Sequence, residues 1–495
     1  MEKMTRYDKI RERAQKRAQK AQQEGKCAEK REWKRRERRE PTHRKGKPLL
    51  TKEMIRELKN YTNPLEQLIL IMNKCFPWLL DELADLNDVR NESYTDYNMQ
   101  EITVIRLIAL CCGIQNMSRI TKQFNRDEFI ENINKILGTE LKKVPCDNTI
   151  SDVINTLNIP ELESLQAKMI RKLIESKTLD KFRLFNGSFY IVLDGTGMFS
   201  RRKEGNGCVY KVYNKDTEDE YTEYHYYVLE AKLVCGDYVF SFATEFVENE
   251  NMSSEQDKQD CELKAAHRLL DKIRKAFPKL PITIGGDALF ANKPFMDACK
   301  SKSMDYIIRY KETVMKTLYE EFKNIPKTIK GDYEYVNNIG YGSGTKATEG
   351  TTNLIRFVCH DKDSEQTEEY ETVDKTAISK GTEFMFITSL KINKDNYQEI
   401  VVFGRRRWKI ENQGFKAQKS KILNIGHAYT YDSNGIKANY LFIQYAHTLL
   451  TILFYGSAII KRLKESNIEI CHLLYEALLK PQELSLENSI QIRFD

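Results

Sequence analysis

The cysteines of this 495-residue chain form no pattern typical of a metal site or a disulfide framework. Eleven are present, but no two are spaced as Cys-x-x-Cys, and only Cys111 and Cys112 are close neighbours. Structural zinc sites and disulfide-rich scaffolds both need cysteines at regular spacings, and disulfides are rare in the reducing cytoplasm. We therefore expect neither kind of site, and we expect a cytoplasmic protein.

Other motifs are missing as well. The chain has no P-loop, no dinucleotide-binding glycine fingerprint and no Ser–His–Asp order of a hydrolase. Its first residues contain no apolar segment of the kind found in secretory signals. The one long hydrophobic run, 438–460, is nearly free of charge but contains Asn439, Gln444 and His447. We interpret it as a buried core helix, with a membrane span as the open alternative.

Positive charge is abundant only at the N-terminal end. The whole chain carries a net charge of +7, whereas residues 1–48 hold 19 Lys and Arg against 8 Asp and Glu, which leaves the rest near −4. A dense basic segment on a nearly neutral body indicates a polyanionic partner, most commonly nucleic acid. A solvated helix or a disordered tail is the open alternative.

The order of the predicted elements indicates the fold. After a mainly helical region, the pattern from Ser188 predicts three strands, a helix, a strand, a helix and a strand. Their ranges are 189–193, 221–235, 238–247, 257–276 (helix), 282–285, 293–300 (helix) and 306–310. This order is typical of the ribonuclease H-like α/β fold, a mixed sheet whose first strands are antiparallel and whose faces carry helices.

We divide the chain into six parts on the basis of these patterns. Gly-rich turns and short β-like runs follow Thr313, and helical sequence returns at Asp395. The parts are a basic arm (1–48), a helical region expected to bind DNA (49–185), the first catalytic part (186–312), a β-rich insertion (313–393), the second catalytic part (394–465), and a C-terminal helix with a tail (466–495).

Three acidic residues occupy positions where chemistry is expected. Asp194 follows the first strand, Asp287 follows the fourth, and Glu411 lies in the helical segment Arg-Arg-Arg-Trp-Lys-Ile-Glu. In a ribonuclease H-like sheet the first and fourth strands are neighbours, so both aspartates would emerge at one edge. Two hard divalent cations held by carboxylates can activate an attacking oxygen and stabilise a leaving one. Each acid alone has an ordinary structural explanation, such as a turn or a pair with Arg407.

The segments around these acids resemble the DDE transposases of bacterial insertion sequences, in particular those with a β-rich insertion before the glutamate. The resemblance covers about half of the chain and rests on residues 192–196, 258–265, 286–292 and 408–415. It implies that Asp194, Asp287 and Glu411 hold two Mg²⁺ ions, with Mn²⁺ as a substitute. It also implies a homodimer assembled on double-stranded DNA, namely the terminal inverted repeats and the target.

The chain departs in part from the Tyr-Arg-Glu-Lys signature of that group. Arg407, four residues before the glutamate, matches. The Tyr position is Gly404 and the Lys position is Gln418, so we assign phosphate contacts to the neighbouring Lys419 and to Lys416. Helical spacing places Lys419 nearer to the face of Glu411 than Lys416.

Arg201 and Arg202 are further candidates for phosphate contacts. They follow the first strand in the stretch Arg-Arg-Lys, where a solvated loop is an equal alternative.

The predicted function is metal-dependent cleavage and strand transfer at the ends of an insertion sequence, in a bacterial cytoplasm and in association with the nucleoid. Two alternatives stay open. One is a transposase relative that binds DNA without cutting it, and the other is a ribonuclease H-like nuclease without strand transfer.

Overall fold

A computed structural model describes residues 63–249, 260–341, 350–359, 381–420, 422–484, 490 and 492–494. The predicted basic arm, 1–48, lies outside the described residues. Among the residues that are described, no helix is both long enough and apolar enough to cross a bilayer. The run 438–460 instead falls mainly within helix α16 (Ser433–Thr451), which is buried along most of its length.

Residues 63–187 are mainly helical, as predicted for the region before Ser188. Its segments are α3 (Pro64–Leu70), η1 (Ile71–Cys75), α4 (Leu79–Ala84), η2 (Glu92–Tyr94), α5 (Met99–Cys111), α6 (Met117–Phe124), α7 (Asp127–Leu137), α8 (Asp147–Thr156), α9 (Ile159–Glu175) and η3 (Asp180–Phe182). Side-chain caps fix several helix starts. For example, Asn98 and Glu101 form a reciprocal capping box at α5, which satisfies amides that the helix itself leaves free.

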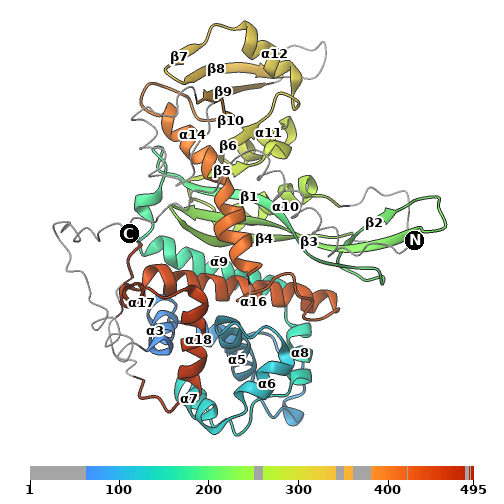
Figure 1. Ribbon diagram of the computed structural model, residues 1–495, viewed down its shortest axis with the longest axis vertical. Helices are drawn as coiled ribbons and strands as arrows, with labels where there is room; N and C mark the ends of the chain where they lie inside the picture. Colours follow the sequence, from blue (N-terminus) through green and yellow to red (C-terminus); the bar gives the residue numbers. More distant parts are fainter. Residues whose placement is uncertain are drawn as a thin grey trace, which may run out of the picture. The chain divides into compact units, whose positions relative to one another are not determined.

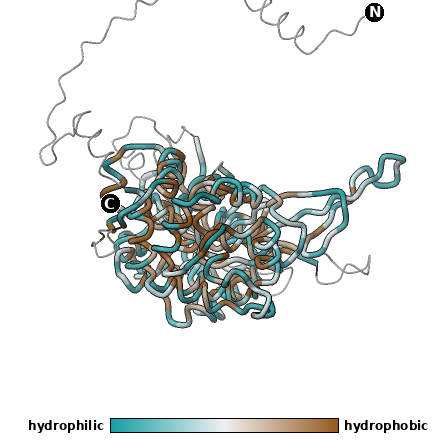
Figure 2. Tube along the Cα trace, turned by 90° about the horizontal axis from the view of Figure 1, so that it is seen from below, coloured by the Kyte–Doolittle hydropathy of each residue, from teal (hydrophilic) through white to brown (hydrophobic). Residues whose placement is uncertain are grey.

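Helices from the C-terminal part pack against this region. They are α16, η7 (Ile452–Gly456), α17 (Ala458–Leu463) and α18 (Asn467–Leu478). Helix α16 contacts α5, α8 and α9, and α18 contacts α3, so the two ends of the described chain share one helical layer, at the bottom of Figure 1. Figure 2 shows the hydrophobic segments gathered in the interior.

The central sheet has the predicted ribonuclease H-like order. Its first five strands are β1 (Phe189–Arg201), β2 (Val209–Tyr213), β3 (Tyr221–Cys235), β4 (Tyr238–Val247) and β5 (Ile282–Gly286), followed by β6 (Asp305–Tyr310). Strand β3 pairs antiparallel with β1 and β4, and β5 lies parallel to both β1 and β6. Helices α10 (Glu262–Ala276) and α11 (Lys293–Ser301), with the short turn η4 (Ala288–Phe290), connect these strands.

The stretch predicted as a β-rich insertion adds strands to the same sheet. It contains α12 (Lys316–Asn324), β7 (Thr328–Lys330), β8 (Tyr333–Tyr341), β9 (Gly350–Val358) and β10 (Glu383–Thr388). Strand β10 pairs antiparallel with β6, and β9, β8 and β7 follow in that order. The described strands therefore form one ten-stranded sheet.

Strand β1 is longer than the predicted 189–193, and β2 was not predicted. Strand β1 continues past Asp194 to Arg201 because β3 is long enough to pair with it up to the Arg201–Tyr224 pair. Strand β2 pairs with the same end of β3, and the resulting hairpin extends beyond the helices (Figure 1). Glycines and polar residues in 194–207 had indicated a loop, but pairing with β3 outweighs this local preference.

The helix predicted from Asp395 to about Lys421 is instead a series of short segments. They are α14 (Tyr397–Arg405), the 3₁₀ turn η5 (Arg406–Trp408), the π-helical segment η6 (Ile410–Phe415) and α15 (Lys416–Gln418). π-Helical turns are rare and are frequently found at functional sites.

Candidate active site

Asp194 lies where strand β1 loses one of its two neighbours. The parallel pairing of β1 with β5 ends at Val192 and Gly285, whereas the pairing with β3 continues, with Asp194 opposite Glu230. Side chains alternate along a strand, so Asp194 belongs to the face of Tyr190 and Val192. Its carboxyl group is half-buried at an open edge of the sheet.

Asp287 reaches the same edge from strand β5. It comes two residues after Gly285, just as Asp194 comes two residues after Val192. Its Oδ1 accepts a hydrogen bond of 2.9 Å from the backbone amide of Leu289 and so caps the turn η4. The register of two parallel strands therefore places the two aspartates side by side, as the sequence analysis expected.

The electrostatics of Asp194 reflect this crowding. The pKa of Asp194 is raised to about 6: burial is the largest cause and the negative charges of Asp287 and Glu262 contribute to the rise, while the Arg407 guanidinium and the Gly195 amide oppose it. Like charges that share a half-buried site disfavour ionisation, and a cation held between them would relieve the repulsion.

Arg407 provides a positive charge at this edge. Its Nη1 lies 3.6 Å from Asp194 Oδ2, and both side chains are about a quarter exposed, at 26% and 24%. Arg407 lies in η5, directly before the segment that carries Glu411. This arrangement brings the beginning of the Arg-Trp-Lys-Ile-Glu motif to Asp194.

Glu411 itself is exposed on η6. The segment is held to the sheet by Ile410 and Phe415, which pack in the hydrophobic cluster that contains Tyr190 and Val192. Within the described residues, no three His, Cys, Asp or Glu side chains stand close enough to surround one metal ion. The structure thus brings Asp194, Asp287 and Arg407 together, but it does not gather Glu411 with both aspartates.

A buried polar network fixes the end of the Glu411 segment. Lys232 Nζ lies 3.2 Å from Glu230 Oε2 and donates hydrogen bonds of 3.3 Å to Gln418 Oε1 and to Gln444 Oε1. A side chain at Gly414 would collide with the Lys232 stem, since a Cβ there would lie 2.8 Å from Lys232 Cδ. Gln418 occupies the position where the signature has Lys, and its side chain is buried in this network.

The other predicted DNA contacts lie at the surface or away from the acids. Lys416 and Lys419 are exposed. Arg201 lies seven residues beyond Asp194 on β1, roughly 20 Å along the strand at ~3.3 Å per residue. Its guanidinium lies 4.7 Å from the Tyr431 ring centre, and that of Arg202 lies 4.2 Å from the Tyr221 ring centre. Arg201 and Arg202 are therefore not beside the aspartates.

The sequence analysis gave no catalytic weight to Glu262, the first residue of α10. Its carboxylate lies at the backbone of Gly195, directly after Asp194, and accepts a 2.5 Å hydrogen bond from the Tyr227 hydroxyl. The available signal was its place in the segment 258–265, one of those that carry the family resemblance.

The donor set at this edge fits a hard divalent cation. Such ions prefer carboxylate oxygens, which Asp194 and Asp287 offer from adjacent strands. In a two-ion site each ion is held by only some of the carboxylates, so the carboxylates need not all lie around the same ion. Asp194 and Asp287 are thus the residues that would hold a shared cation.

Comparison with known families agrees with this geometry. Residues 254–449 match the family described as the transposase DDE domain. The chain carries a DDE-type transposase domain. The matched range includes Glu262, Asp287 and Glu411, and it begins after Asp194.

A search of solved structures gives a loose match. The cryo-EM structure of the piggyBac transposase synaptic complex with hairpin DNA aligns at 12% identity, over 86% of this chain and 81% of that chain, with a TM-score of 0.35. No curated protein matches the chain by sequence.

Proposed function

We propose that this transposase cleaves DNA at the ends of an insertion sequence and joins the released ends to target DNA, using two Mg²⁺ ions for which Mn²⁺ can substitute. The observation that supports the proposal is the register of β1 and β5, by which Asp194 and Asp287 follow adjacent parallel strands, with Asp287 inside the residues that match the transposase DDE domain. Bound there, the ions would supply an activated attacking oxygen and stabilise the leaving one.

The protein's own residues divide the remaining work. Asp194 and Asp287 would hold the ions, with Glu411 as the third acid. Arg407, 3.6 Å from Asp194, positions a DNA phosphate at the metal site, as its planar, bidentate guanidinium suits this ligand. Lys416 and Lys419, both exposed, contact phosphates further along the duplex.

The proposed partners are the terminal inverted repeats and the target duplex, bound by a homodimer. The basic segment 1–48 would add affinity that is independent of sequence, because its excess positive charge releases counterions from DNA. The proposed location is the bacterial cytoplasm, in association with the nucleoid.

The test uses a plasmid that carries the coding sequence's own flanking repeats. Purified transposase in Mg²⁺ is expected to release the segment between the repeats and to join it to a second plasmid, and Asp194→Asn is expected to do neither. Cleavage without joining would favour a nuclease instead. Specific binding without cleavage by the wild-type protein would favour a DNA-binding relative.

A further inference from the structure

The end of β1, strand β2 and the first half of β3 form a ribbon, residues 199–226, that extends beyond the helices (Figure 1). Its outermost paired residues are Tyr213 and Tyr221. Successive side chains of a strand point to opposite faces, and along this part of β2 and β3 they are half-buried or exposed on both faces. Neither face of the ribbon is therefore covered by another layer, and both are accessible to a partner.

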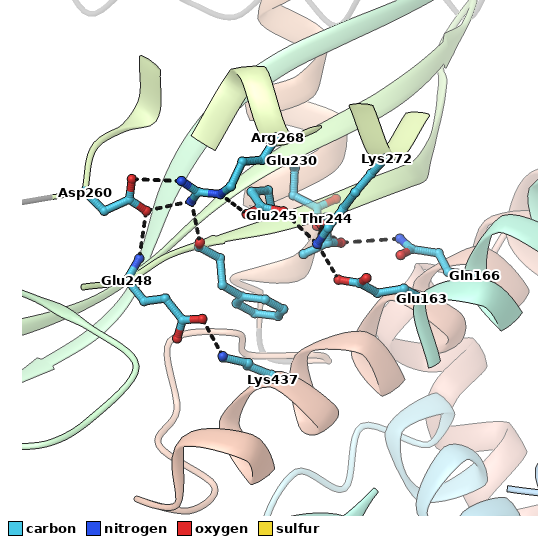
Figure 3. A network of polar contacts seen from close by, with 11 residues as sticks. Glu163, Gln166, Glu230, Thr244, Glu245, Glu248, Asp260, Arg268, Lys272 and Lys437 are labelled. Atoms are coloured by element: carbon cyan, nitrogen blue, oxygen red, sulfur yellow. Dashed lines mark hydrogen bonds and ion pairs between the residues drawn. The ribbon is translucent and has the colours of Figure 1, made fainter. Parts of the chain in front are cut away.

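The base of the ribbon is fixed to the body of the protein. Lys437 of α16 pairs with Glu248 at 2.6 Å, and the backbone amide of Glu248 donates a 3.1 Å hydrogen bond to Asp260 (Figure 3). The next amide, that of Asn249, donates a 3.2 Å hydrogen bond to the carbonyl of Cys208, the residue before β2. Side chains on the ribbon are therefore presented from an anchored base.

The two arginines at the end of β1 have different surroundings. Arg201 is half-buried, donates a 2.5 Å hydrogen bond to the Glu204 carbonyl and lies against the Tyr431 ring. A Cβ on Gly205 would lie only 2.3 Å from its Nη2, so Arg201 is built into the loop that follows β1. Arg202, by contrast, is exposed. Arg201 thus stabilises the base of the ribbon, and Arg202 can reach an external partner.

Arg202 and Lys211 lie on one face of the ribbon, and each is held against a tyrosine. The Arg202 guanidinium lies 4.2 Å from the centre of the Tyr221 ring, and Lys211 Nζ lies 4.8 Å from the centre of the Tyr213 ring. The two rings stack on each other, with centres 5.1 Å apart and planes 13° from parallel. The face of an aromatic ring attracts a cation, so both cations are positioned by the rings while they stay exposed.

The charges of the ribbon are divided between its stem and its turn. The stem, residues 199–213, holds four Lys and Arg against one Glu, whereas the turn, residues 214–220, holds one Lys against four Asp and Glu. Glu223, which faces the same way as the two cations, accepts a hydrogen bond from Ser200 and lies 3.7 Å from His225 Nε2. The stem therefore suits an anionic partner, and the turn does not.

The stem is a continuation of the strand that carries Asp194. Arg202 lies eight residues beyond Asp194, roughly 26 Å along the strand at ~3.3 Å per residue. A DNA duplex rises ~3.4 Å per base pair, so a duplex that runs from the aspartates along β1 would pass Arg202 after about eight base pairs. The cations of the stem are thus within reach of DNA held at the candidate active site.

We infer that this face of the ribbon binds the backbone of double-stranded DNA beside the cleavage site, with Arg202 and Lys211 contacting phosphates and Tyr221 and Tyr213 positioning the two cations. Phosphate contacts of this kind orient a duplex without reading its sequence. The inference rests on the proposed function, because it takes DNA as the partner and assigns a further surface to it.

The test measures binding of the full-length protein to a long duplex of unrelated sequence, without divalent metal, by fluorescence anisotropy at a series of salt concentrations. The double variant Arg202→Ala with Lys211→Ala should lower the log–log salt slope by about 1.8, at ~0.9 for each lost phosphate contact, and weaken binding about 10-fold at physiological salt. Lys215→Ala is the matched control, because it removes the same charge from the acidic turn of the same ribbon. Its slope and affinity should equal those of the wild type.

The role of the rings is tested at Tyr221. Tyr221→Leu should weaken binding a few-fold but keep the full salt slope, because Arg202 still reaches its phosphate without being held in place. Tyr221→Phe retains the ring and should bind like the wild type. Normal affinity of Tyr221→Leu would overturn the positioning role of the ring.

The outcomes separate the inference from the proposed function. If the wild-type protein binds no duplex, DNA is the wrong partner and both fail. If the wild type binds and the double variant keeps the full salt slope, only the inference is overturned. Dissociation of a dimer by the double variant without DNA, measured by sedimentation, would also overturn it, because the ribbon would then join two copies of the chain.

Thermal unfolding of each variant reports on folding. Should the double variant fail to fold, the single variants Arg202→Gln and Lys211→Gln take its place, and each is expected to lower the slope by about 0.9. A full slope in both would overturn the inference.

Discussion

The acids at the candidate site are held in two different ways. Asp194 and Asp287 project from adjacent parallel strands, where backbone register fixes their relative position. Glu411 lies on the π-helical segment η6, which is held by apolar packing and, at its far end, by the network of Lys232 and Gln418. The strand-borne pair is assembled by the fold, whereas the position of Glu411 depends on how a short, irregular helical segment packs.

Because of this difference, experiments can distinguish the contribution of the two strand aspartates from that of Glu411. Backbone hydrogen bonds fix the register of the two strands, whereas a π-helical turn has an i→i+5 hydrogen-bond pattern that is rare and frequently found at functional sites. We therefore expect the aspartates to define metal binding in the free protein. Glu411 would contribute most when DNA and metal are both bound.

The largest effect is expected for Asp287→Asn. Two-ion sites stabilise transition-state charge by several kcal/mol, and each ~1.4 kcal/mol is tenfold in rate, so end cleavage should fall about 10⁴-fold. Mn²⁺ binding to the free protein should fall as well. Because Asp287 Oδ1 also caps the turn η4, Asn, which retains an acceptor oxygen, is the suitable replacement. Cleavage within tenfold of wild type would remove Asp287 from the site.

Glu411→Gln should reduce cleavage slightly less, by about 10³-fold, for the same reason. Its distinguishing result is Mn²⁺ binding without DNA, which should stay within a few-fold of wild type because Glu411 is exposed and not gathered with both aspartates. Binding to the terminal repeats should survive, since phosphate and base contacts elsewhere supply that energy. Equal loss of Mn²⁺ binding in Glu411→Gln and Asp287→Asn would contradict the expectation that the aspartates, and not Glu411, define metal binding in the free protein.

The same distinction explains what could be predicted from the sequence. Short apolar runs that end at an acid identify β1 and β5, and the ribonuclease H-like order makes these strands neighbours, so the proximity of Asp194 and Asp287 was predictable. The extension of β1 to Arg201 depends on pairing with residues more than twenty positions away, and local glycines conceal it. Three strands (β2, β3 and β4) lie between Gly195 and Glu262 in the sequence, so only tertiary packing shows their contact.

The Glu411 region was the least predictable. Its apolar spacing suits one continuous helix, but Gly404 and Gly414 are packed against Phe386 and Lys232, respectively, and the chain there changes from α to 3₁₀ to π geometry. The inward orientation of the Gln418 side chain follows from that change in helix geometry. A helical wheel for a regular α-helix therefore gives only an approximate orientation for the residues after Glu411.

Arg407→Ala should have an intermediate effect, about 10²-fold on cleavage, because it removes a charge-assisted phosphate contact rather than a metal ligand. The Asp194 pKa should rise further without the guanidinium that now opposes the rise, but Mn²⁺ affinity at pH 8 should stay close to normal. Arg407→Lys keeps the charge without the bidentate geometry and should recover only part of the activity. Loss of Mn²⁺ binding in Arg407→Ala would show that Arg407 chiefly organises the metal ligands.

The smallest effect is expected at Lys419. Gln418 is fully buried and donates a 2.6 Å hydrogen bond to Gln444, so the signature's lysine position cannot present a charge to DNA here, whereas the next residue is exposed. Lys419→Ala should weaken binding to the terminal repeats only a few-fold and lower the log–log salt slope by about 0.9, as the loss of one phosphate contact does. Lys416→Ala removes the same charge from the helix that Lys419 caps; because Lys416 is also proposed to contact a phosphate, it is the comparison variant and should lower the slope by a similar amount. Mn²⁺ binding should be unchanged in both variants. A full salt slope in Lys419→Ala together with a reduced slope in Lys416→Ala would assign the contact to Lys416, and would show that the segment after Glu411 turns further than its α-helical spacing suggests.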